Sequence, residues 1–156
     1  MLFFVAFLLM TMFLPSKGSW NLSIPILLPV LFVLLFLIFI IHEGIHGIFF
    51  KVFGGTNSKV RFGFKNGMLY ATSPNSRFSK KQFLCISLAP FVVITIVLTV
   101  LLVLGILPRM VFVFLAAIHG GGCVGDFYWT YLLSEEPENI EVEDTESGFN
   151  IYIKAE

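Results

Sequence analysis

Long apolar runs constrain the fold of this chain more than any other feature. Three of them cover residues 26–53, 83–107 and 110–133, and a shorter one covers residues 2–14. A helix needs about 20 apolar residues to cross a bilayer. A soluble domain of 156 residues would also carry more charge than the 13% found here. We therefore expect an all-α integral membrane protein with three to four transmembrane helices, in which residues 2–14 form a short first span.

The segment between the second and third runs, residues 54–82, is different in character. Residues 59–64 alternate between polar and apolar side chains, and residues 68–72 form a second strand-like run. Asn66-Gly67 between them is a strong signal for a two-residue β-hairpin turn. Such a turn sets the strand register and predicts two pairs, Lys65 with Met68 and Phe64 with Leu69.

Charge is distributed very unevenly along the chain. Seven of the ten Lys and Arg residues lie between Lys51 and Lys81, and eight of the ten acidic residues lie between Glu135 and Glu156. By the positive-inside rule the basic loop is cytoplasmic. We expect a membrane-embedded domain over residues 1–133, which includes the hairpin loop 54–82, and an acidic cytoplasmic tail over residues 134–156.

The tail ends in an alternating stretch, residues 149–153, which we expect to add a strand to the hairpin. The location predicted from these patterns is a cell membrane, crossed several times, with loop 51–82 and the C-terminal tail in the cytoplasm.

Five residues of the second apolar run carry the pattern of a zinc site, His42-Glu43-Gly44-Ile45-His46. On a helix, His42 and His46 lie ~40° apart around the axis and ~6 Å apart along it. Two imidazoles one turn apart can bind one zinc ion, and Glu43 can accept a proton from a water molecule as general base. Because polar groups are costly within a span, a coincidental match is disfavoured.

A catalytic zinc ion needs a third protein ligand. Asp126 is the other acidic residue within apolar sequence. It lies nine residues before Glu135, and His42 lies nine before Lys51. If both spans end on the same face of the membrane, the two residues lie at similar depth. The alternative is an acid that only forms a helix-end or interhelical hydrogen bond.

Other residues of the last span have weaker assignments. His119 is a candidate substrate or oxyanion contact, an alternative metal ligand, or an ordinary interhelical hydrogen-bonding group. Its neighbouring glycines allow close approach of another element. Cys85 and Cys123 offer no disulfide framework, and we expect both to be buried small hydrophobic residues.

With these residues in place, the sequence resembles the site-2 protease class of intramembrane metalloproteases and, more narrowly, a zincin peptidase family of unknown function related to that class. The resemblance rests on the zinc-site pattern at residues 42–46, on Leu88-Ala89-Pro90, and on Gly125-Asp126. It implies zinc bound by His42, His46 and Asp126, with Glu43 as catalytic base.

The expected function is that of an intramembrane zinc metalloendopeptidase that hydrolyses peptide bonds of membrane-associated substrates. Two alternatives remain: a non-catalytic metal-binding membrane protein, and an ion or metal transporter. The expected partners are a membrane protein or peptide substrate and the lipid bilayer, with no nucleic acid. The pattern does not indicate an oligomeric state.

Overall fold

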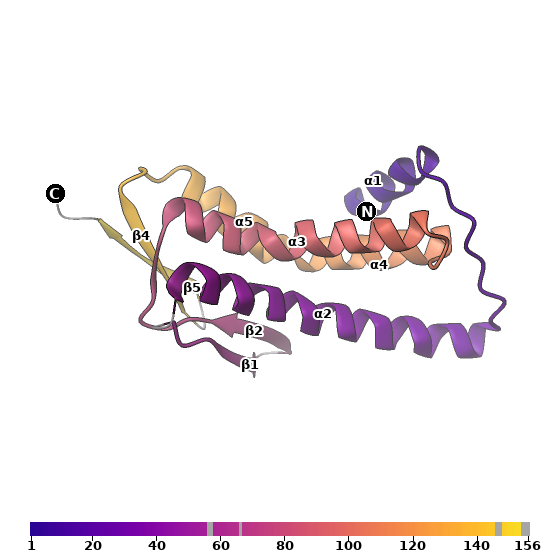
Figure 1. Ribbon diagram of the computed structural model, residues 1–156, viewed down its shortest axis with the longest axis horizontal. Helices are drawn as coiled ribbons and strands as arrows, with labels where there is room; N and C mark the ends of the chain where they lie inside the picture. The colour runs from indigo at the N-terminus through magenta and orange to yellow at the C-terminus, as the bar shows by residue number, and fades with distance from the viewer. Residues whose placement is uncertain (56–57, 66, 146–147, 154–156) are drawn as a thin grey trace. The chain divides into compact units, whose positions relative to one another are not determined.

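The computed structural model describes residues 1–55, 58–65, 67–145 and 148–153. Within these described ranges there are five helices and five short strands (Figure 1). They form two compact units, one made of residues 1–39 and 91–124 and the other of residues 40–90 and 125–156.

The helices follow the apolar runs. They are α1 (Leu2–Met12), α2 (Ile24–Gly54), α3 (Lys80–Val103), α4 (Arg109–Gly122) and α5 (Val124–Ser134). Within the described ranges, α2 and α3 are each long and apolar enough to cross a membrane, and α4 with α5 would make a third span if the pair is taken together. The structure thus supports two spans, or up to three, whereas α1 has only 11 residues.

The run predicted as one span over residues 110–133 is interrupted at Cys123. Gly120, Gly121 and Gly122 come immediately before the break. Consecutive glycines weaken a helix because each loses more backbone freedom than any other residue when it becomes helical. The break separates His119 on α4 from Asp126 on α5.

In the first unit, α1 packs on α4 through aromatic side chains. The rings of Phe7 and Phe112 meet edge to face with centroids 5.9 Å apart. Gly120 lets α1 approach closely, since a Cβ atom there would lie 2.8 Å from the ring of Phe3. A Cβ atom on Gly122 would lie 2.6 Å from the ring of Phe39 on α2, so Gly122 likewise allows close approach. These two glycines therefore serve close packing, as expected from small residues in spans.

In the second unit, β1 (Arg61–Lys65) and β2 (Met68–Thr72) form an antiparallel hairpin beside the C-terminal part of α2 (Figure 1). Lys65 pairs with Met68 and Phe64 with Leu69, which confirms the predicted register. Asn66 of the predicted turn lies outside the described residues, and Gly67 has a positive φ of 85°.

A second sheet corrects the all-α prediction. It contains β3 (Arg77–Ser79), β4 (Ile140–Thr145) and β5 (Gly148–Ile153) in the antiparallel order β3-β4-β5. Residues 149–153 therefore pair with β4, and the prediction that they extend the hairpin is wrong. The reason is packing: β4 turns Ile140 and Val142 into the core of this unit, which contains Phe50, Phe78, Phe83, Ile86 and Leu133.

Candidate metal centre

The centre begins with two histidines on one face of α2. His42 and His46 are both buried, and their ring centroids lie 4.8 Å apart. Their Nε2 atoms approach to 3.2 Å. The spacing of four residues on a helix produces this arrangement, because positions i and i+4 are neighbours on the helix surface.

A backbone carbonyl orients the second of these rings. His46 Nδ1 lies 3.0 Å from the carbonyl oxygen of Ile86 on α3. A carbonyl oxygen can only accept a hydrogen bond, so Nδ1 carries the proton and donates it. In the neutral ring the lone pair is then on Nε2, the atom that faces His42. This is the usual arrangement of a metal-binding histidine and its supporting acceptor.

Asp126, in the first turn of α5, completes the group. Its Oδ2 lies 3.3 Å from His42 Nε2, and its Oδ1 lies 3.3 Å from His46 Nε2. One ligand atom from each of the three residues lies within 4.8 Å of the others. The structure therefore brings together the three residues predicted as metal ligands, from two helices far apart in the sequence.

These donor atoms fit a zinc ion. Two imidazole nitrogens and a carboxylate are the ligands that zinc takes in catalytic sites. With zinc–ligand distances of about 2.0–2.1 Å, two corners of a tetrahedron are about 3.3 Å apart, which agrees with the observed separations of 3.2–3.3 Å. Acceptor atoms packed this closely in a largely buried site repel one another unless a proton or cation lies between them.

Glu43, the predicted base, lies beside this group. Its carboxylate lies within electrostatic range of His42, His46 and Asp126, and it accepts a hydrogen bond from the backbone N–H of Ala71 on β2. The hairpin therefore contributes to the orientation of Glu43.

A further acid near the centre, Asp144 on β4, was not found from the sequence. Its carboxyl lies within electrostatic range of His46, Glu43 and Asp126, and burial raises the pKa of this carboxyl to about 7. Thr72 Oγ1 donates a hydrogen bond of 3.3 Å to the backbone carbonyl oxygen of Asp144. The alternation of β4 was the available signal, since Asp144 follows the buried residues Ile140 and Val142 on the same strand face.

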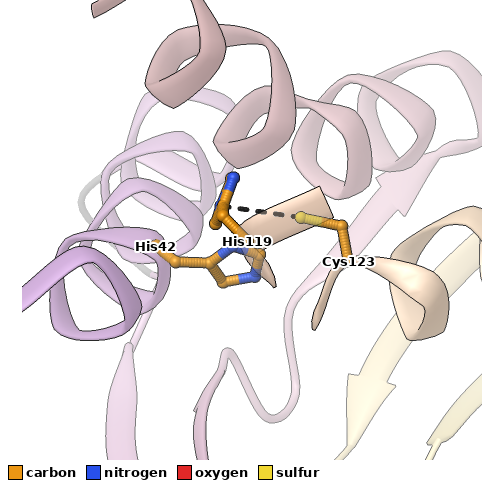
Figure 2. Close-up of side chains that lie close together, drawn as sticks. All are labelled: His42, His119 and Cys123. Atoms are coloured by element: carbon orange, nitrogen blue, oxygen red, sulfur yellow. Dashed lines mark hydrogen bonds between the residues drawn. The ribbon is translucent and has the colours of Figure 1, made fainter. Parts of the chain in front are cut away.

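His119 belongs to the first unit, where it is completely buried. Its Nε2 lies 3.6 Å from Cys123 Sγ (Figure 2), and its ring stacks on that of Phe91. Cys123 is buried as predicted, whereas Cys85 is exposed, so the prediction for Cys85 is wrong. The role of His119 toward a substrate stays a prediction.

Comparison with known proteins adds a family. A family model described as "Putative zincin peptidase" matches residues 35–140, which include His42, Glu43, His46 and Asp126 but not Asp144. No curated protein and no solved structure matches the chain. Zincins are zinc-dependent peptidases, so the match indicates a metallopeptidase. Because the matched segment covers more than half of the sequence, this chain belongs to that zincin peptidase family.

Proposed function

We propose that this protein is an intramembrane zinc metalloendopeptidase that cleaves membrane-associated protein or peptide substrates. The observation that carries the proposal is the convergence of His42 Nε2, His46 Nε2 and the Asp126 carboxylate at 3.2–3.3 Å. The first two residues lie on α2, a helix of 31 residues that is long and apolar enough to span a bilayer. The proposal puts the zinc site within the membrane on this basis.

Each residue then has a defined task. His42, His46 and Asp126 hold the metal, and the Ile86 carbonyl keeps His46 in the tautomer that leaves Nε2 free to bind. A zinc ion bound there supplies Lewis acidity toward a water molecule and a peptide carbonyl. Glu43 accepts the proton of the attacking water and can return it to the leaving amine.

The substrate follows from the surroundings of the site. A regular membrane helix hides its carbonyl groups in hydrogen bonds, so the scissile segment must be locally unwound. We propose a cell-membrane location with the basic loop 51–82 and the acidic tail in the cytoplasm, from the charge distribution of the sequence.

Metal analysis tests the site. The purified protein in detergent should contain about one zinc ion per chain, and His46→Ala or Asp126→Ala should weaken zinc affinity by at least about 100-fold, because loss of a direct ligand costs more than loss of its supporting partner. Glu135→Gln, an exposed acid of the tail, is the matched control and should retain zinc.

Glu43→Gln separates a peptidase from a non-catalytic metal-binding protein or a transporter. This variant should keep zinc but lose proteolysis, so that uncleaved membrane proteins accumulate in cells that express it and can be identified by quantitative mass spectrometry. An unchanged membrane proteome, together with full zinc content, would favour the non-catalytic alternative.

A further inference from the structure

A cavity of about 280 Å³ lies next to Glu43 in the second unit. Its wall is formed by the α2 surface and the hairpin, through Ile40, Gly44, Phe62, Leu69 and Tyr70. Glu43 is the only ionisable carboxylate among the lining residues. The cavity is open on one side, and a molecule in it would contact apolar and aromatic side chains together with the proposed catalytic base.

Two glycines give the cavity its form. A Cβ atom on Gly44 would meet no other atom within 4 Å, so the helix surface beside Glu43 is open at this position. A Cβ atom on Gly63 would lie only 2.4 Å from the ring of Tyr70, its cross-strand partner. Without a side chain on Gly63, the Tyr70 ring lies across β1 and forms part of the wall.

We propose that this cavity is a substrate-specificity subsite that receives one apolar side chain, of about leucine size, from a residue next to the scissile peptide bond. The inference rests on the proposed peptidase function and extends it. The contact with Glu43 indicates that the bound residue is next to the scissile bond. A side chain in this cavity places its own backbone near the Glu43 carboxylate, which is the proposed general base.

Size and chemistry determine the occupant. Sites for drug-sized ligands have volumes of about 300–1,000 Å³, so a cavity of about 280 Å³ suits one side chain with its adjoining backbone. A charged side chain would lose its hydration among Ile40, Phe62 and Leu69 without a partner other than Glu43, which disfavours acidic residues most strongly.

The test uses three peptide-like hydroxamates, which bind zinc through the hydroxamate group and differ in one side chain: methyl, isobutyl or benzyl. Binding to the detergent-solubilised zinc protein is measured by calorimetry. We expect the isobutyl compound to bind the wild-type protein at least about tenfold more tightly than the methyl compound, since three more apolar carbons leave water.

Filling the cavity should remove this preference. In Gly44→Leu, the isobutyl and methyl compounds should bind within about threefold of each other, with the affinity for the methyl compound little changed. The matched control is Gly121→Leu, a helical glycine of the first unit whose Cβ would also meet nothing within 4 Å. It should keep the full preference.

A variant that enlarges the cavity keeps the test independent of how Gly44→Leu folds. Leu69→Ala should shift the preference toward the benzyl compound by at least about fivefold. A zinc-loaded wild-type protein that binds all three compounds equally, or Gly44→Leu and Leu69→Ala proteins with wild-type preferences, would overturn the subsite. A wild-type protein without zinc would instead overturn the proposed function, and the subsite with it.

Discussion

At the residue scale, the chemistry of the centre depends on partners that are distant in sequence. The Nε2 lone pair of His46 is available to the candidate metal site because the carbonyl oxygen of Ile86, 40 residues later, accepts a hydrogen bond from Nδ1–H. The zinc-site pattern predicts the two histidines, but a pattern of residue types contains no information on which ring nitrogen is protonated. That choice depends on a backbone carbonyl of another helix.

Asp144 should make the stability of the metal-free protein depend on pH. Its pKa in the folded protein is about 7, above the ordinary value of 3.8, so its contribution to stability is complete below pH 3.8 and is lost as the pH rises to about 7. The side chain of the Asp144→Asn variant cannot ionise, so the variant does not lose this stability as the pH rises. Relative to wild type, the variant should therefore gain on the order of 4 kcal/mol between these limits.

Thermal unfolding of chelator-treated protein in detergent, followed from pH 4 to pH 8, would measure this difference. The melting temperature of Asp144→Asn should rise relative to wild type by on the order of 10 °C over that range. Parallel pH profiles for the two proteins would contradict a raised pKa at Asp144.

Two adjacent lysines at the start of α3 should differ sharply in their contribution to stability. Lys80 is 7% exposed, donates hydrogen bonds to the carbonyls of Ser134 and Glu136, and pairs with Glu138 at 3.2 Å. Lys81 is 85% exposed and lies 4.0 Å from the same glutamate. Lys80→Met removes the buried donor of these two hydrogen bonds and should lower the free energy of unfolding by about 1–3 kcal/mol.

Lys81→Met is the matched control and should change the free energy of unfolding by less than about 0.5 kcal/mol. Unfolding of both variants in detergent by heat or denaturant would measure the difference. Equal effects would mean that Lys80 does not hold the end of α5 against the start of α3.

At the scale of elements, local pattern predicted the helices and the hairpin well. The register of β1 and β2 followed from the turn position alone, because a two-residue turn leaves one way to pair the flanking residues. The pairing of β5 with β4 instead of the hairpin did not follow from the pattern. An alternating stretch indicates a strand and a buried face, but many strand edges are compatible with it.

Adjacent glycines of α4 allow a test of the packing between α1 and α4. A Cβ atom on Gly120 would lie 2.8 Å from the Phe3 ring, whereas one on Gly121 would meet nothing within 4 Å. Gly120→Ala should destabilise the protein by about 1–3 kcal/mol through overpacking. Gly121→Ala should stabilise it by about 0.5–1 kcal/mol, because alanine loses less backbone freedom in a helix.

Melting temperatures in detergent should therefore move in opposite directions for these two variants, by about 2–4 °C per kcal/mol. A stabilised Gly120→Ala protein would show that α1 does not pack closely on α4.

At the scale of the whole molecule, the apolar surface of α2 and α3 indicates membrane association. The two helices have 31 and 24 residues and expose many large apolar side chains, among them Phe32, Phe36 and Ile96. Such a surface is costly in water, and both helices are long enough for the hydrocarbon core.

The protein should therefore remain in the membrane pellet after extraction with alkaline carbonate and should enter solution only with detergent. A peripheral membrane protein of the same cells serves as the control for extraction. Release of this chain by carbonate alone would contradict spanning helices, because such treatment removes proteins held only at the surface.

The sequence alone determined the apolar helices, the hairpin register and the chemical identity of a candidate zinc site on α2, since these depend on residue types at short, regular spacings. The tertiary structure decided the features that depend on contacts between residues of distant segments. It brought the Asp126 carboxylate against both imidazoles, set the tautomer of His46 through Ile86, and placed Asp144 and the cavity beside Glu43. Spacing along one element defines neighbours on that element, whereas contacts between elements depend on how the whole core packs.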